Sequence, residues 1–260
     1  MPEGDTITRA ARNLQAVLAG HRLVRFEAPR MVGRPPRPGT TVLSVEARGK
    51  HLLVHFSDGR ALHTHMRMTG SWHLYRGDEP WRRPHARASV VLEVEDGTVA
   101  VCFSAPTVEL MDPDRTLRRT VLDALGPDLC RADVDLDDAN RRLARLEPST
   151  EIGVALLDQR VAAGIGNVYK SEVCFACRVD PGRRLAELDD ATRRELLETA
   201  AKLLQANLDS PRRTTVPGGL AVYGRAGAAC RRCGTTIRRR RQGDQARSTY
   251  WCPTCQPRGR

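Results

Sequence analysis

Hydrophobic residues in the first half of the chain follow two different periods. Between Thr6 and Leu18 they recur every three or four positions and Gly20 follows as a stop signal, which predicts an amphipathic helix. After a loop rich in proline and arginine at 29–38, they fall in short runs separated by turns such as Asp58-Gly59. The runs predict strands at 41–45, 52–56, 61–66, 71–75, 88–94 and 99–103. Such strands are typical of a β-sandwich, which we expect to extend to about residue 115.

The pattern becomes helical after Asp112-Pro113. Apolar residues at helical spacing predict helices at 117–125, 136–146, 151–160 and 185–208. A linker rich in proline, threonine and glycine at 210–219 leads to a basic segment that contains four cysteines. The expected fold class is therefore α+β, with more than one domain.

Composition and net charge indicate the kind of partner that this protein binds. Of the 260 residues 40% are hydrophobic, enough to fill real cores. A net charge of +11 favours a polyanion, and nucleic acid first of all. A solvated arginine-rich surface would explain the charge, but the run Arg238–Arg241 between two cysteine pairs favours a nucleic-acid interface. No run approaches the roughly 20 apolar residues of a membrane helix, and no signal peptide is visible, so we expect a cytoplasmic protein without a membrane partner.

Cysteine spacing predicts a metal site. Two C-x-x-C pairs separated by eighteen residues are typical of a zinc ribbon, in which four thiolates close a structural tetrahedral site. The ligands are Cys230, Cys233, Cys252 and Cys255. Two disulfides or four buried thiols are the less favoured alternatives. Segments 235–240 and 246–251 are expected to form a hairpin between the pairs. A third pair, Cys174 and Cys177, could bind metal or act in redox chemistry only with Cys102 and Cys130, so we favour ordinary half-buried thiols.

Two further segments are candidates for chemistry. Gly164-Ile165-Gly166 follows the predicted helix at 151–160 and precedes a second helix that is predicted to begin at Asn167. Asn167 is a good N-cap residue type, so its side chain and the backbone N–H groups of this turn could bind a phosphate. A plain tight turn is the simpler alternative. At the N-terminus, removal of Met1 would expose the secondary amine of Pro2, a nucleophile that can form an iminium with a sugar C1′, beside the proton donor Glu3. The simpler alternative there is a frayed terminus.

Five segments together resemble the signature motifs of the Fpg/Nei family of DNA glycosylases. They occur in the family's order and at both ends of the chain. The segments are Pro2-Glu3-Gly4-Asp5-Thr6, Gly49-Lys50, Leu157-Asp158-Gln159-Arg160 with 163–169, Tyr223-Gly224-Arg225, and Arg247-Ser248-Thr249-Tyr250-Trp251-Cys252-Pro253.

The resemblance implies a fold and a reaction. It implies a catalytic β-sandwich with an opening helix at 1–115, a hinge at 116–130, a helix-two-turn-helix DNA-binding domain at 131–224 and a β-hairpin zinc finger at 225–260, with DNA between the domains. The partner is damaged double-stranded DNA, or single-stranded or bubble DNA, bound by a monomer at the nucleoid. One structural zinc ion is expected, with no redox or nucleotide cofactor.

The resemblance also implies roles for single residues. Pro2 matches the Schiff-base nucleophile and Glu3 the proton donor. Lys50 matches the lysine that contacts the lesion phosphate and assists β-elimination, Asn167 a phosphate ligand, and Arg247 the zinc-finger arginine that contacts phosphate and assists δ-elimination. Met68, in a segment similar to the family's intercalation loop, is the expected wedge.

Three features favour the endonuclease VIII branch of the family. Gly4 follows Pro2-Glu3 where the formamidopyrimidine branch has leucine, segment 103–110 lacks an Arg-Arg-Phe-Gly motif, and the stretch 214–223 is short for a loop that caps a purine. Asp5-Thr6 suggests an actinobacterial subgroup. We therefore expect oxidised pyrimidines as substrates. The alternatives are an oxidised-purine glycosylase for 8-oxoguanine or formamidopyrimidine, and a catalytically silent protein that binds abasic sites or damage. A zinc-ribbon module of transcription would leave Pro2-Glu3 unexplained.

Overall fold

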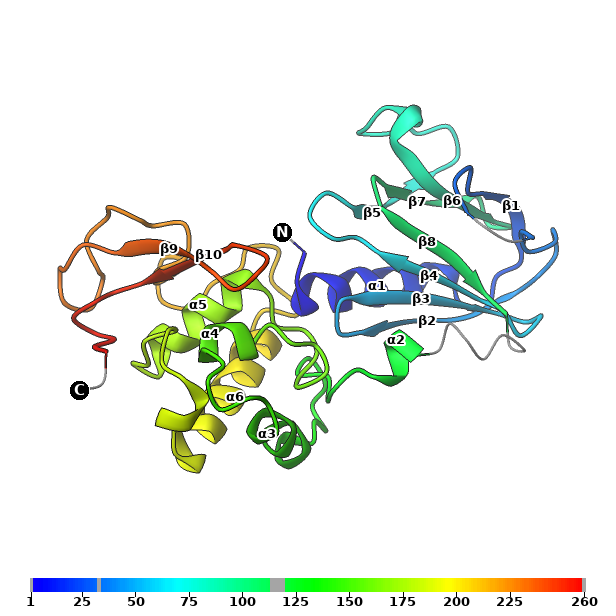
Figure 1. Ribbon diagram of the computed structural model, residues 1–260. Helices are drawn as coiled ribbons and strands as arrows, with labels where there is room; N and C mark the ends of the chain where they lie inside the picture. The colour runs from blue at the N-terminus through cyan, green and yellow to red at the C-terminus, as the bar shows by residue number, and fades with distance from the viewer. Residues whose placement is uncertain (1, 32–33, 113–119, 259–260) are drawn as a thin grey trace. The chain divides into compact units, whose positions relative to one another are not determined.

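The structure, a computed structural model, describes residues 2–31, 34–112 and 120–258. The chain divides into two compact units, the N-terminal unit of residues 1–123 and the C-terminal unit of residues 124–260 (Figure 1). Met1 and parts of the predicted hinge and of the predicted helix at 117–125 lie outside the described residues. In the described part, no helix has the length and apolar character needed to span a bilayer.

The N-terminal unit contains two four-stranded antiparallel sheets and an opening helix. The strand orders are β1-β6-β7-β5 and β2-β3-β4-β8. One face of α1 supplies Ile7, Leu14 and Leu18 to a core that also takes side chains from both sheets. The elements are α1 (Gly4–Leu18), β1 (Leu23–Glu27), β2 (Val42–Arg48), β3 (His51–Phe56), β4 (Ala61–His65), β5 (Ser71–Arg76), η1 (His85–Arg87), β6 (Ala88–Val94), β7 (Thr98–Phe103), β8 (Thr107–Met111) and α2 (Thr120–Asp123).

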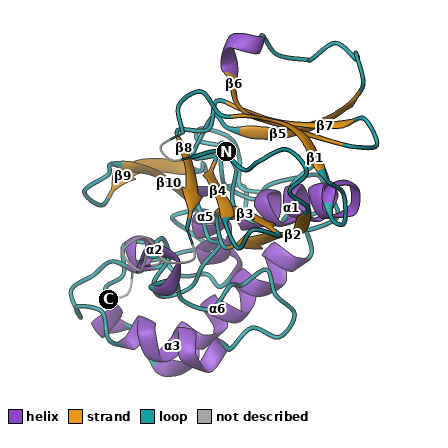
Figure 2. Ribbon diagram, turned by 90° about the vertical axis from the view of Figure 1, so that its right-hand side faces the viewer, coloured by secondary structure: helices purple, strands orange, loops and turns teal. Residues whose placement is uncertain are grey.

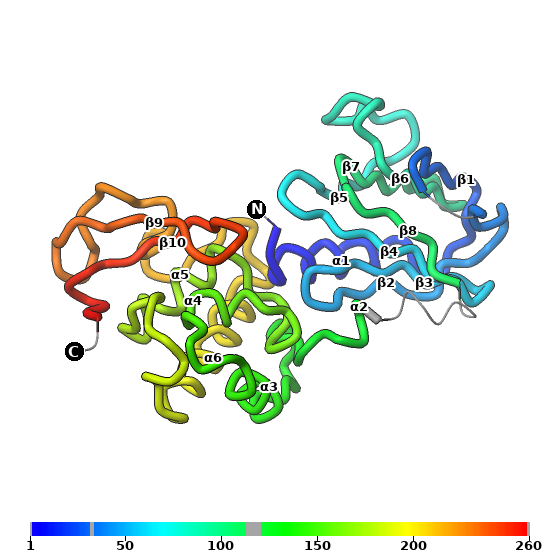
Figure 3. The backbone as a smooth tube through the Cα atoms, in the orientation of Figure 1, coloured from blue at the N-terminus to red at the C-terminus, as the bar shows by residue number. Residues whose placement is uncertain are grey.

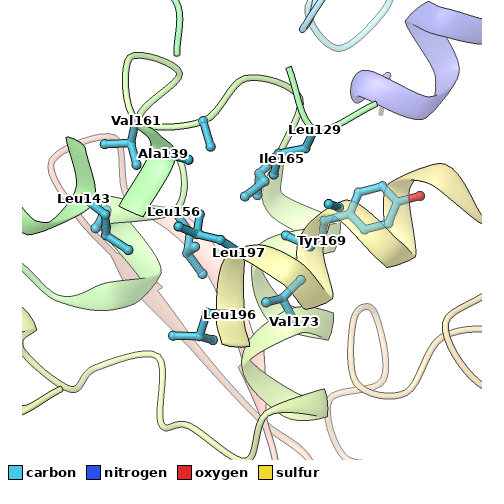
Figure 4. Close-up of a cluster of buried hydrophobic side chains, with 14 of the residues drawn as sticks. Leu129, Ala139, Leu143, Leu156, Val161, Ile165, Tyr169, Val173, Leu196 and Leu197 are labelled. Carbon is cyan, nitrogen blue, oxygen red and sulfur yellow. The ribbon is translucent and has the colours of Figure 1, made fainter. Parts of the chain in front are cut away.

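The C-terminal unit combines helices with one hairpin, and Figure 2 shows that its strands are confined to that hairpin. Its core is built by side chains from α3, α5, α6 and the turns between them, which point toward one another in Figure 4. The elements are α3 (Leu136–Ala144), α4 (Ile152–Ala155), α5 (Asn167–Ala176), η3 (Leu185–Glu187), α6 (Asp190–Gln205), β9 (Arg238–Gln242) and β10 (Arg247–Trp251).

The helix predicted at 136–146 ends two residues early, at Ala144, and two other predicted helices are shortened more because polar side chains make hydrogen bonds to the backbone at their ends. The helix expected at 151–160 ends at Ala155, after which Asp158 accepts from Arg160 N at 2.9 Å. The Gln159 amide donates to the Leu157 carbonyl at 2.9 Å, which stabilises a turn in place of a further helical turn. The helix expected at 185–208 begins only at Asp190, because the Asp189 side chain caps it.

Candidate functional site

The proposed nucleophile and proton donor lie at the start of α1. Pro2 is half-buried and Glu3 occupies the N-cap position, where its carbonyl accepts from Thr6 N at 2.9 Å and Ile7 N at 3.1 Å. The Glu3 side chain is only 1% exposed, and Asp5 in the first turn is 2% exposed. The positive end of a helix dipole favours carboxylates at these positions. Pro2 therefore directly precedes the N-cap of a well-formed helix and lies next to a buried carboxyl group.

Lys50 lies in a tight turn between two paired strands. Arg48 at the end of β2 pairs with His51 at the start of β3, so Gly49 and Lys50 form a two-residue turn. Gly49 has φ +58, a conformation that such turns require and that glycine adopts without strain. Gly49 is buried and Lys50 is half-buried at the tip. The turn thus presents the lysine from a rigid hairpin.

The loop 66–70 between β4 and β5 presents Met68 to solvent. Met66 is 2% exposed and belongs to the core, whereas Met68 is 65% exposed. The loop is closed by a hydrogen bond from Gly70 N to Met66 O at 2.9 Å, and a Cβ at Gly70 would lie 2.8 Å from the Met66 Cα. The Thr69 hydroxyl donates to the Ser104 carbonyl at 3.2 Å. An apolar side chain on an anchored loop is suited to insertion between bases.

These three features share one end of the N-terminal unit. The start of α1, the β2–β3 turn and the β4–β5 loop lie at the same end of the sheets (Figures 1 and 3). The motifs that indicated Pro2, Lys50 and Met68 are separated along the chain, so the fold brings them to a common edge.

A histidine cluster beside Lys50 was not expected from the sequence. His51 on β3 and His63 on β4 are buried, and their nitrogens Nδ1 and Nε2 lie 2.8 Å apart. Nδ1 of His63 lies 3.5 Å from Oε2 of Glu109 on β8. The ring of His65 lies 4.8 Å from that of His51. No local motif marks this cluster, since β3, β4 and β8 assemble it.

In the C-terminal unit, Asn167 and the zinc-finger hairpin are directly linked. The helix α5 begins at Asn167, as the sequence predicts, although Gly166 and not Asn167 occupies the N-cap position. The Asn167 amide donates to the Ser248 carbonyl at 2.7 Å, and its Oδ1 is buried with no hydrogen-bond partner among the residues that the structure describes. Arg247 precedes Ser248 and donates to Gln245 at 2.8 and 3.1 Å. The two predicted phosphate ligands are therefore brought together.

A buried polar network joins α5 to the hairpin. Lys170 is fully buried and its Nζ donates to the Thr249 hydroxyl at 2.6 Å. Thr249 donates in turn to Gln242 at 2.7 Å, and the Gln242 amide donates to Glu151 at 2.7 Å. Lys170 and Thr249, like Gln242 and Glu151, lie far apart in sequence, so no spacing signal could have revealed these contacts. The network fixes β9 and β10 against the helices of the same unit.

A second buried carboxylate holds the segment 214–223. Glu172 on α5 is 1% exposed and accepts hydrogen bonds from the three backbone N–H groups at 221–223 at 2.7–2.8 Å. The Thr215 hydroxyl also donates to it. Arg231 donates to the carbonyls at 217 and 218 at 2.7 and 3.0 Å. The short segment is thus tied down at both ends and in its middle.

The four predicted zinc ligands converge. Their Sγ atoms all lie within 4.8 Å of one another. The closest sulfur pairs are Cys233–Cys255 at 3.4 Å, Cys233–Cys252 at 3.5 Å and Cys230–Cys255 at 3.9 Å. Tetrahedral zinc with Zn–S bonds of about 2.3 Å needs sulfur separations of about 3.8 Å. The donor set therefore fits one structural zinc ion.

The other C-x-x-C pair forms no metal cluster among the described residues. Cys174 is fully buried, and burial raises the pKa of its thiol well above the ordinary range. Burial also raises the pKa of Cys177 to about 11. Both are therefore protonated thiols at neutral pH, which makes them poor metal ligands and nucleophiles.

Comparison with known families agrees with this architecture. Three family profiles match the chain: the formamidopyrimidine-DNA glycosylase N-terminal domain at 1–106, the formamidopyrimidine-DNA glycosylase H2TH domain at 125–216, and a zinc finger found in FPG and IleRS at 227–258. A probable endonuclease 8 2 of Streptomyces coelicolor is 45% identical over 98% of this chain and 94% of its own length. The chain belongs to the Fpg/Nei family of DNA glycosylases. The resemblance seen in its motifs and the predicted fold class are thereby confirmed.

Other members of the family are similar over their full length. A protein of Mycolicibacterium smegmatis named as a DNA-(apurinic or apyrimidinic site) lyase is 39% identical over 98% of this chain and 99% of its own length. Lactococcus lactis Fpg in a complex with DNA that contains an oxidised pyrimidine has a TM-score of 0.83 at 25% identity, covering 99% of this chain and 100% of that one. The same enzyme bound to DNA with an AP site has a TM-score of 0.82 at 26% identity, with the same coverage.

Proposed function

We propose that this protein is a bifunctional DNA glycosylase and AP lyase that removes oxidised bases, with pyrimidines favoured. The observation that carries the proposal is Pro2 beside the buried Glu3 at the start of α1, in a chain of the Fpg/Nei family. Because its substrate is damaged chromosomal DNA, we place the enzyme in the cytoplasm, at the nucleoid.

The proposed chemistry starts at the N-terminal amine. After Met1 is removed, the Pro2 nitrogen attacks C1′ of the damaged nucleotide, and Glu3 protonates the sugar ring oxygen as the ring opens. The bond to the base breaks and the base leaves, which gives an iminium between Pro2 and C1′. The iminium acidifies the C2′ proton, whose loss breaks the C3′–O bond. A second elimination breaks the C5′–O bond, and water then releases Pro2.

The other residues hold the DNA in place. Lys50 in its rigid turn contacts the phosphate of the lesion and assists β-elimination. Asn167 and Arg247 lie together in the C-terminal unit and bind further phosphates, and Arg247 assists δ-elimination. Met68 fills the position in the base stack that the extruded base leaves. Extruding that base from the duplex costs a few kcal/mol. The zinc ion held by the four cysteines has a structural role, because four thiolates leave no open position for substrate.

The preference for pyrimidines rests on the segment 214–223. Glu172 and Arg231 tie down this short segment, which leaves little free chain to fold over a bulky purine. The chain's relatives are named as endonuclease 8 enzymes, whereas its structural neighbours include Fpg bound to DNA with a pyrimidine or a purine lesion. The oxidised-purine alternative therefore has a specific observation behind it and belongs in the test.

A lesion panel tests the proposal. Protein shown to lack Met1 is incubated with duplexes that contain dihydrouracil, 8-oxoguanine or an abasic site, and base release and strand cleavage are followed separately. We expect cleavage at dihydrouracil and at the abasic site, with slower release of 8-oxoguanine. Glu3→Gln should abolish base release, whereas Glu27→Gln on the exposed edge of β1 should not. Faster release of 8-oxoguanine would favour the purine alternative, and binding without cleavage would favour a damage-binding protein.

A further inference from the structure

A partly exposed glutamate and two buried histidines lead from the edge of the sheet to the Lys50 turn. They are Glu109 on β8, His63 on β4 and His51 on β3, which we call the Glu109–His63–His51 chain. The contacts are 3.5 Å between Glu109 Oε2 and His63 Nδ1, and 2.8 Å between His63 Nε2 and His51 Nδ1. His63 is in register with Glu109, so neighbouring strands deliver the members to one face of the sheet. Lys50 directly precedes the last member.

Glu109 sets the direction of the hydrogen bonds in this chain. Nδ1 of His63 faces the Glu109 carboxylate at 3.5 Å, and because a carboxylate only accepts hydrogen bonds, this contact favours the tautomer of His63 with its proton on Nδ1. Nε2 of a neutral His63 is then an acceptor, and Nδ1–H of His51 donates to it. This leaves Nε2 of His51 with a lone pair. The last ring of the chain is therefore fixed as an uncharged acceptor.

The surroundings keep these rings neutral. Burial, followed by the charges of His63, His65 and Lys50, lowers the pKa of His51 to about 3. Burial lowers the pKa of His63 against the raising effect of Glu109, and burial with His63, Arg67 and Lys50 lowers the pKa of His65 to about 4. The charged groups around the cluster are thus Glu109 from β8, Lys50 from the β2–β3 turn and Arg67 from the loop 66–70. The charge of Lys50 thus disfavours protonation of both His51 and His65.

The cluster also contacts the loop that carries Met68. Nδ1 of His65 accepts a hydrogen bond from Arg67 N at 3.3 Å, so a neutral His65 carries its proton on Nε2. Arg67 has φ +44, which a non-glycine residue rarely adopts, and the contact with His65 holds its backbone in place. His51 directly follows Lys50 and His65 directly precedes this loop, and their ring centroids lie 4.8 Å apart.

We propose that Glu109, His63 and His51 are positioning residues for Lys50, which hold the lysine turn against a neutral acceptor ring so that its ammonium meets the lesion phosphate. This inference rests on the proposed function, because the three side chains act on the reaction only through Lys50. Neutral rings are needed for that role, since an imidazolium next to Lys50 would repel its ammonium and compete for the phosphate.

The first test reads the tautomers directly. Two-bond ¹H–¹⁵N correlation spectra of the zinc-loaded protein distinguish Nδ1–H from Nε2–H imidazoles. We expect His51 and His63 as Nδ1–H tautomers and His65 as the Nε2–H tautomer at pH 7. In Glu109→Gln the amide can donate to His63, which reverses the chain, so His51 and His63 should change to Nε2–H. Finding His51 as Nε2–H in the unaltered protein would overturn the proposal.

The second test asks whether Glu109, His63 and His51 influence cleavage through Lys50. Single-turnover cleavage of abasic-site DNA is measured for Glu109→Gln, Lys50→Ala and the double variant. We expect Glu109→Gln to slow cleavage about tenfold by misplacing the lysine, and to have less than about a twofold effect when Lys50 is already alanine. His55→Gln is the matched control. Its ring on the same strand also pairs with a carboxylate, Glu46, at 3.1 Å, and we expect it to leave the cleavage rate unchanged.

The outcomes separate this inference from the proposed function. Equal slowing by Glu109→Gln with and without Lys50, together with a lower Tm, would show a merely structural role and overturn the proposal. If Lys50→Ala slows cleavage and Glu109→Gln does not, only this inference fails. If Lys50→Ala has no effect, the role of Lys50 in the proposed function fails, and the inference fails with it.

Discussion

At the scale of single residues, the N-terminal unit buries ionisable side chains that ordinarily face water. Glu3 and Asp5 lie buried at the start of α1, and His51 and His63 lie buried in the sheet. Sequence motifs pointed to Glu3, because a carboxyl group beside a terminal proline has an evident chemical use. The histidines gave no such signal, since a histidine on a strand says nothing about the rings it will meet across the sheet. Burial of these groups makes the stability of the unit depend on pH.

The histidines predict loss of stability in mild acid. Their pKa values of about 3 for His51 and about 4 for His65 lie below the value of about 6.5 in an unfolded chain. Between those limits the unfolded chain binds protons that the folded chain does not, so stability is full above about pH 6.5 and falls as the pH decreases. We expect the Tm to drop between pH 7 and pH 5 by circular dichroism, and His51→Gln to reduce the drop. An equal drop in the variant would contradict this assignment.

At the scale of elements, the sequence predicts all four central strands of the β-sandwich but only two of its four edge strands. The six strands predicted in the sandwich are present, and they carry continuous or alternating apolar runs. The two missed strands, β1 and β8, are at the edges of their sheets, where one side faces solvent and charged residues such as Arg25 and Glu109 are tolerated. Exposed loops and hairpins likewise depend on specific hydrogen bonds to the rest of the unit. The loop 66–70 and the hairpin strand β10 each lead to a prediction.

One prediction concerns the loop 66–70, which carries the proposed wedge Met68. Met68→Ala removes the exposed apolar tip while Met66 stays in the core, so the fold should be preserved. We expect base release from duplex DNA to slow about tenfold, equivalent to about 1.4 kcal/mol, because less of the vacated stack is filled. Cleavage of a single-stranded abasic site should not change. Leu43→Ala, which truncates another exposed side chain of the unit, is the control, and equal slowing in both variants would refute the wedge.

The second concerns the link between α5 and β10. Thr249→Val keeps the shape of the side chain but removes the hydroxyl that accepts from Lys170 and donates to Gln242. Each partner loses a buried hydrogen bond, so we expect the free energy of unfolding to fall by about 1–3 kcal/mol in denaturant titration. The exposed Thr236→Val should change it by less than about 0.5 kcal/mol. A neutral effect of Thr249→Val would show that the network does not stabilise the unit.

At the scale of the whole molecule, five motifs spread along the sequence were enough to predict the family, hydrophobic periodicity predicted the fold class, and cysteine spacing predicted the zinc ligands. What they could not predict are contacts between residues that only the folded chain brings together, such as Lys170 with Thr249 or His63 with Glu109. The two residues of each contact are not separated by a short, regular number of positions in the sequence, because they lie on different strands and helices. The positive charge of the chain, +11, acts at this scale too, since it favours association with DNA irrespective of sequence.

Removal of zinc tests how the C-terminal unit depends on its metal. In native mass spectrometry we expect one zinc ion per chain for the unaltered protein and none for Cys252→Ser, because Cys252 is a buried member of the cysteine cluster. Binding of structural zinc contributes on the order of 10 kcal/mol to folding, so the hairpin that carries Arg247 should unfold and duplex binding should be lost. Cys177→Ser, outside the cluster, should retain zinc and binding. Full binding by zinc-free protein would contradict the structural role.

The central claim is that the N-terminal proline performs the chemistry. Borohydride is added to protein shown to lack Met1 on duplexes with an abasic site or dihydrouracil, and the cross-linked peptide is identified by mass spectrometry. The account predicts a covalent adduct on Pro2 with both DNAs, and none when an extra residue precedes Pro2. An adduct on a lysine such as Lys50, or no adduct from protein that still binds the DNA, would contradict it.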